Sequence, residues 1–118
     1  MQTTNHRQLM HDVNDVNDVL APFRAANPEL MQGFGGMAKV AMANGEIPSK
    51  HKELIALALG ISQHCSACIA FHMKALIGLG VTRAELEETL AVCVYMGGGL
   101  ALMYSAEALA TFDELANP

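Results

Sequence analysis

The chain is poor in aromatic and basic residues and contains no tryptophan. Aromatic residues make up 5% of its 118 positions, so the 52% hydrophobic content comes mainly from Ala, Leu and Met. Such a composition suits helices. The seven Lys and Arg residues stand singly against twelve Asp and Glu, which leaves no basic stripe to neutralise a phosphate backbone. We therefore expect a helical protein that does not bind nucleic acid.

Targeting and membrane signals are also weak. The first eight residues, MQTTNHRQ, lack the charged and then apolar order of a signal peptide, which predicts a cytoplasmic protein. Residues 89–106 carry no charge and reach the lower limit for a membrane span. Three consecutive glycines and two tyrosines in this segment favour a pair of packed helices instead, in a core or an oligomer interface. We predict no membrane partner.

The length fits a single domain covering residues 1–118, with room for one hydrophobic core. A small monomer has difficulty hiding so much apolar surface, because its surface is large relative to its volume. We therefore expect subunit interfaces and predict a homo-oligomer.

No alternating run flanked by hairpin turns occurs, so the pattern predicts an all-α fold with about six helices. Apolar residues at helical spacing indicate a first helix over residues 4–21, ending or kinking at Pro22. Asn27 and Pro28 predict the start of a second helix, with the Asn27 side chain as its cap. Three glycines inside that helix, at positions 33, 35 and 36, suggest close contact with another helix or a ligand, or a local kink.

The remaining helices follow from caps and glycines. Ser49 is the expected cap of a third helix, whose residues 54–61 are apolar on all sides and predict a core element or a subunit contact. A fourth helix should begin at Cys65 or Ser66 and stop at residues 78–80. Thr82 and Glu85 form a capping-box pattern for a fifth. After the glycines at 97–99 the pattern resumes to about residue 115.

The chemistry is concentrated between Glu53 and His72. With 3.6 residues per turn, Cys65, Cys68 and His72 fall within roughly 60° of arc and share one helix face. Two cysteines three apart at a helix start can form a disulfide, and the positive end of the helix dipole favours thiolate there. His72, one turn beyond Cys68, is placed to accept or return a proton. The pattern predicts a redox-active CxxC site.

Glu53 is expected to face His72. If the third and fourth helices form an antiparallel hairpin near residues 63–64, Glu53 and His72 lie at heights that differ by only about 3 Å. The spacing therefore supports a relay in which Glu53 orients His72, and His72 serves a cysteine.

Glu53, Cys65, Cys68 and His72, with eleven, two and three residues between them, resemble the alkylhydroperoxidase D-like branch of the carboxymuconolactone decarboxylase family. Family-like sequence extends over roughly residues 28–110. The resemblance implies an all-helical fold, trimers or hexamers, and thiol-dependent reduction of hydroperoxides or partner disulfides. It requires no bound cofactor beyond an external thiol or dithiol reductant, and it allows a redox partner protein.

In that family, the cysteine nearer the histidine is attacked by peroxide and its neighbour resolves it. By position these roles pass to Cys68 and Cys65, with His72 and Glu53 as the proton relay. The founding peroxidases carry a histidine between the two cysteines, where this chain has Ala67. The decarboxylase branch lacks the cysteine pair, so lactone decarboxylation fits this sequence poorly.

Other interpretations remain open from the residues alone. The cysteines and His72 could be inert core residues, or zinc ligands together with His64. The chain could also be a non-enzymatic redox sensor or interaction subunit whose disulfide state changes its assembly. Cys93 lies in an apolar helix with no acid or base nearby in sequence, which favours core packing over a redox role.

Overall fold

The computed structural model describes residues 12–117, which contain five helices and no strand. The helices are α2 (Val13–Ala26), α3 (Pro28–Met42), α4 (Ser49–Ser62), α5 (Ser66–Gly78) and α6 (Arg83–Ala116). The all-α prediction is confirmed, and the number of helices is close to the six expected.

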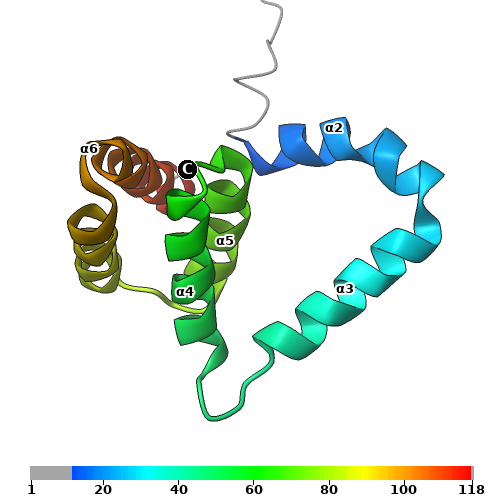
Figure 1. The fold of residues 1–118 in the computed structure, drawn as a ribbon, viewed down its shortest axis with the longest axis horizontal. Helices are drawn as coiled ribbons and strands as arrows, with labels where there is room; N and C mark the ends of the chain where they lie inside the picture. Colours follow the sequence, from blue (N-terminus) through cyan, green and yellow to red (C-terminus); the bar gives the residue numbers. More distant parts are fainter. Residues whose placement is uncertain (1–11, 118) are drawn as a thin grey trace, which may run out of the picture.

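Helices α4, α5 and α6 pack together and enclose the core (Figure 1). Each contributes apolar side chains that are almost completely removed from water. The largest of them are Leu57, Ile61, Ile69, Met73, Leu76 and Leu86. Burial of each such side chain contributes on the order of 1.5–3 kcal/mol, so this three-helix core holds α4 and α5 in fixed register.

Helices α2 and α3 form an arm that extends away from this core (Figure 1). None of the residues of α3 is buried. The radius of gyration is 14.9 Å, compared with about 13.5 Å for a compact domain of this length. The start of α2 is anchored, since Val13 and Val16 are buried, but α3 obtains little of its stability from packing within the described chain.

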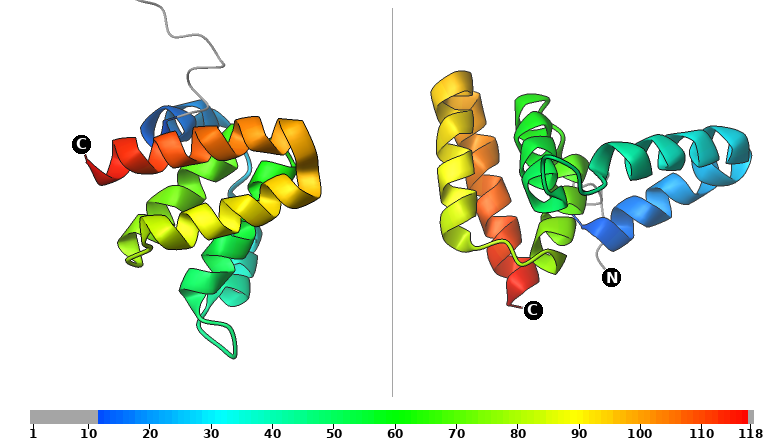
Figure 2. Two further views of the ribbon diagram at one scale, coloured as in Figure 1. Left: turned by 90° about the vertical axis from the view of Figure 1, so that its left-hand side faces the viewer. Right: turned by 90° about the horizontal axis from the view of Figure 1, so that it is seen from below.

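Helix α6 contains a sharp bend at Gly98, whose φ of 71° and ψ of −148° lie outside the helical region. The expected fifth and sixth helices are its two halves, which run back alongside each other (Figure 2). Among the described helices, only α6 is long and apolar enough to cross a membrane. The reversal at Gly98 instead returns its second half to the start of α5, where Ser66 contacts Glu107.

The N-terminal expectations need correction. The expected first helix overlaps α2, which begins at Val13 and continues through Pro22 to Ala26; residues 4–11 lie outside the described part. A proline inside a helix removes one backbone hydrogen bond, and the neighbouring turns of α2 tolerate that loss. The Asp12 side chain caps α2 by accepting from the backbone N–H groups of Asn14 and Asp15.

Two other predicted caps are wrong in detail. Helix α3 begins at Pro28 as expected, but Asn27 makes no side-chain capping bond and donates instead to the Phe23 carbonyl. Ser49 is the first residue of α4, and its hydroxyl donates to the Met42 carbonyl. Each side chain thus bonds to a carbonyl in the last turn of the preceding helix, one of the carbonyl groups that have no hydrogen-bond partner within their own helix.

The capping box predicted for the start of α6 is present, with reciprocal bonds between Thr82 and Glu85. The three glycines of α3 do not mark a close contact within the described chain, since an added Cβ at any of them meets no atom within 4 Å. Residues 54–61 are buried on one side only, because Ile55 and Leu59 are 50% and 55% exposed.

Candidate active site

The turn between α4 and α5 positions the two cysteines. The Cys65 backbone N–H donates to the Gly60 carbonyl at 2.9 Å, and Cys65 is the N-cap residue of α5. Its sulfur accepts a hydrogen bond from the backbone N–H of Cys68 at 3.2 Å. Cys65 and Cys68 form a disulfide with a Cα–Cα distance of 5.2 Å. The pair therefore lies where unpaired helix N–H groups and the helix dipole stabilise negative charge.

Gly60 allows α4 to pack directly against this pair. A Cβ built on Gly60 would lie 3.2 Å from the Cβ of Cys68, tighter than an ordinary van der Waals contact. Gly60 itself is buried. A side chain at this position would require Cys68 to shift by a few tenths of an ångström, so Gly60 marks a close approach of α4 to the disulfide.

Glu53 and His72 meet across the α4–α5 hairpin. His72 Nδ1 lies 2.7 Å from Glu53 Oε2, and the side chains of His72 and Glu53 are 33% and 13% exposed. A carboxylate only accepts, so Nδ1 carries the hydrogen in this contact and the other ring nitrogen is free to exchange a proton. The mostly buried acid therefore fixes the orientation of a partly exposed base.

The structure brings together the four residues singled out in the sequence. Glu53 comes from α4, Cys65 from the helix cap, and Cys68 and His72 from the first two turns of α5. The predicted Glu53–His72 contact is present. On an α-helix, residues four apart are neighbours, with Cβ atoms about 5–6 Å apart. Thus His72 stands beside Cys68, and the catalytic roles of all four remain a prediction.

Cys93 lies outside this group. It is a free, partly buried cysteine packed against the core. Burial raises the pKa of its thiol, because the charged thiolate loses solvation. This agrees with the packing role expected for Cys93. Within residues 12–117, no group of three or more His, Cys, Asp or Glu side chains is placed to hold a metal ion.

Sequence reasoning missed the contacts that the second half of α6 makes with the cysteine turn. The ring of Tyr104 stacks on His64, with centroids 5.1 Å apart. Ser66, between the cysteines, donates its hydroxyl hydrogen to Glu107. These α6 residues are about 40 positions away in sequence, so no local spacing could have indicated them.

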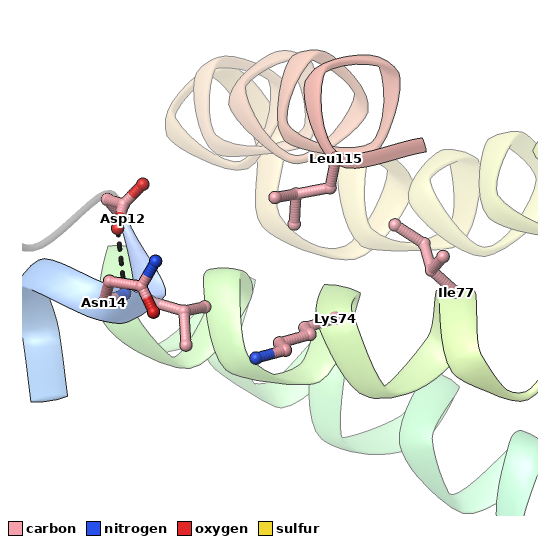
Figure 3. Close-up of a pocket in the computed structure, with 6 residues that line it drawn as sticks. Asp12, Asn14, Lys74, Ile77 and Leu115 are labelled. Atoms are coloured by element: carbon pink, nitrogen blue, oxygen red, sulfur yellow. Dashed lines mark hydrogen bonds between the residues drawn. The ribbon is translucent and has the colours of Figure 1, made fainter. Parts of the chain in front are cut away.

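A cavity of about 300 Å³ lies elsewhere, between the start of α2, α5 and the end of α6 (Figure 3). It is lined by Asp12, Val13, Asn14, Lys74, Ile77 and Leu115. Lys74 follows His72 by two residues, a rotation of about 200° around the helix. The cavity is therefore on the side of α5 away from the cysteines and is separate from the candidate active site.

The family model of the carboxymuconolactone decarboxylase family matches residues 28–111. The matched part includes α4, α5 and the whole Glu53–Cys65–Cys68–His72 arrangement. The chain belongs to this family, and its all-helical fold and cysteine pair are consistent with the alkylhydroperoxidase D-like branch.

Among solved structures, the chain is similar to the apo crystal structure of a carboxymuconolactone decarboxylase family protein from Legionella pneumophila. The two share 47% identity and a TM-score of 0.87, over 93% of this chain and 98% of the other. An uncharacterized protein from Cupriavidus necator is 38% identical over 87% of this chain and 91% of its own length. Uncharacterized protein 4 in the cox locus of Paracoccus denitrificans is 31% identical over 76% of this chain and 81% of its own length.

Proposed function

We propose that this protein is a thiol-dependent oxidoreductase that reduces hydroperoxides, or the disulfides of a partner protein, through Cys65 and Cys68. The observation that carries this proposal is the disulfide at the start of α5 beside the Glu53–His72 pair. A nucleophilic thiol next to a base that is itself oriented by an acid is the arrangement used in nucleophilic catalysis.

With a hydroperoxide, the reaction begins at Cys68. His72 accepts the proton of the Cys68 thiol, the resulting thiolate attacks the outer oxygen, the O–O bond breaks, and the departing alkoxide takes that proton from His72. The product is a Cys68 sulfenic acid, which condenses with the Cys65 thiol to give the disulfide and water. An external thiol or dithiol then supplies two electrons and two protons to restore both thiols. The chain needs no bound cofactor or metal for this cycle.

Replacing Cys68 with Ser tests the proposal directly. We expect the variant to lose dithiol-dependent consumption of cumene hydroperoxide, because a hydroxyl cannot form the sulfenic acid. Cys93→Ser is the matched control and should keep the wild-type rate, since Cys93 packs against the core. A Cys68→Ser variant that consumes peroxide at the wild-type rate would exclude the proposed role. Activity on a disulfide substrate alone would restrict the function to disulfide exchange.

We also propose that the protein acts in the cytoplasm as a homo-oligomer, a trimer or hexamer. The support for self-association is the apolar stripe of α3, in which Leu30, Phe34, Met37 and Val40 are 57%, 60%, 62% and 78% exposed. Helical spacing places these side chains on one face. A second copy offers an apolar surface of the same kind on α6, where Tyr95 is 86% exposed. Light scattering at micromolar concentration should show an assembly, and a monomer would contradict this.

A further inference from the structure

The chain leaves α4 through a Schellman turn in which His64 occupies the left-handed position. Gln63 is the C-cap residue of α4. The His64 N–H donates to the Ile61 carbonyl at 3.1 Å, and the Cys65 N–H donates to the Gly60 carbonyl at 2.9 Å; these are the two hydrogen bonds of that motif. His64 has a φ of 56°, where glycine is usual because a Cβ approaches the following carbonyl oxygen. Cys65 therefore follows directly on a residue with a strained backbone.

The side chain of His64 is held by a distant part of the chain. Tyr104, on the second half of α6, stacks on the His64 ring with centroids 5.1 Å apart and an angle of 23° between the two rings. Tyr104 is partly buried and packs against the core, which fixes the position of its ring. An offset aromatic stack stabilises the pair beyond the area that it buries. The stack therefore offsets part of the cost of the left-handed backbone at His64.

This backbone conformation places Cys65 beside Cys68. Cys65 is the N-cap residue of α5, and its sulfur lies 3.2 Å from the Cys68 backbone nitrogen. In the oxidised protein, the disulfide itself ties Cys65 to the first turn of α5. After reduction that tie is gone, and only the turn's hydrogen bonds and the stack keep His64 in the left-handed region. Holding two reacting groups together raises their effective concentration, so the stack favours closure of the disulfide.

We propose that Tyr104 is a positioning residue for the cysteine pair: by stacking on His64, it keeps Cys65 beside Cys68 in the reduced protein and makes the pair a stronger reductant. The inference deepens the proposed function and rests on it for its biological meaning. Equilibrium with dithiothreitol measures this property. Reduction of the protein breaks its S–S bond and adds two electrons and two protons, while dithiothreitol is oxidised to its cyclic disulfide.

The test is equilibration of full-length protein with reduced and oxidised dithiothreitol at pH 7, followed by alkylation and mass spectrometry of the peptide that carries Cys65 and Cys68. Tyr104→Leu keeps an apolar side chain against the core and removes the ring. We expect it to shift the equilibrium about fivefold toward the reduced pair, a potential about 20 mV higher. Tyr104→Phe keeps the ring and should stay within twofold of the wild type.

Phe112→Leu is the matched control. Phe112 is also a partly buried aromatic residue packed against the core, about two turns beyond Tyr104 on the same half of α6. Its replacement should leave the equilibrium within twofold of the wild type. If Tyr104→Leu does not fold, His64→Ala removes the same stack at an exposed residue and should give the same shift.

A double variant shows whether Tyr104 acts through His64. His64→Gly leaves no ring for Tyr104 to stack on, so adding Tyr104→Leu to it should change the equilibrium less than twofold. The proposal is wrong if Tyr104→Leu stays within twofold of the wild type or favours the disulfide. It is also wrong if Tyr104→Phe or Phe112→Leu reproduces the shift, or if Tyr104→Leu has its full effect without the His64 ring. No peroxide is present, so the proposed peroxide reduction can fail while this role of Tyr104 stands, and the reverse also holds.

Discussion

Removing the charge of Glu53 without removing its shape tests whether this acid supports His72 in the reaction. In Glu53→Gln, the amide oxygen still accepts from His72 Nδ1, so the 2.7 Å contact and the ring orientation are retained. What is lost is the difference between a charge-assisted and a neutral hydrogen bond. Those bonds contribute about 1.5–3 and about 0.5–1.5 kcal/mol respectively. The difference between the midpoints of these ranges is about 1.3 kcal/mol.

If that difference acts on a transition state in which His72 exchanges a proton, the rate falls about tenfold. Glu53→Ala, which also removes the orienting group, should lower the rate further, toward the hundredfold loss typical of missing acid–base assistance. Because Glu53 is only 13% exposed, solvent weakens the effect little. The assay is stopped-flow consumption of cumene hydroperoxide by pre-reduced protein over a range of pH.

Glu46→Gln is the control, because it makes the same charge change at an exposed residue between α3 and α4. A second comparison uses His72→Asn. If Glu53 acts through His72, adding Glu53→Gln to His72→Asn should cost little more, since the acid then has no base to orient. A further tenfold loss in the double variant, or an unchanged rate and pH profile in Glu53→Gln, would remove Glu53 from the relay.

Two other expectations concern the architecture around the site. Gly98→Ala should destabilise the fold by about 1–3 kcal/mol, because the backbone at φ 71° and ψ −148° is accessible almost only to glycine. Gly99→Ala has open space and should be neutral or stabilising in the same thermal melts; equal losses at both positions would refute the bend as the cause. Hydrogen bonds from the Thr82 backbone and from Lys50 lower the pKa of Glu85 below its ordinary value of 4.5. The charged form thus stabilises the fold above that pH, and the stability deficit of Glu85→Gln relative to wild type should be full at pH 7 and shrink as the pH falls below about 4.5; urea unfolding at pH 7 and pH 3 measures it, and a constant deficit would refute the linkage.

The sequence by itself determined the helical class and the local arrangement of the site. A helix repeats every 3.6 residues, so spacing alone put Cys65, Cys68 and His72 on one face. The hairpin register of Glu53 followed from counting residues on either side of one turn, and the two side chains indeed meet. The Thr82–Glu85 capping box was also predictable, because both partners lie within one helical turn.

Caps that depend on neighbouring segments were less predictable. Ser49 and Asn27 each have a side chain suited to an N-cap, yet both bond to a carbonyl of the preceding helix. Residue type favours a local bond, but the geometry of the turn decides which partner lies within reach. Pro22 was also expected to end or kink its helix, yet α2 continues to Ala26 although the proline removes one backbone hydrogen bond.

Only the tertiary structure decided what surrounds the cysteines. The bend at Gly98 returns the second half of α6 to the start of α5, and this brings Tyr104 to His64 and Glu107 to Ser66. The tertiary structure also showed that α4 approaches Cys68 closely at Gly60 and that the apolar face of α3 is exposed. Such contacts join residues far apart in the chain, and periodicity describes only neighbours along one helix. The reactive groups were therefore readable in the sequence, while their electrostatic environment was set by the fold.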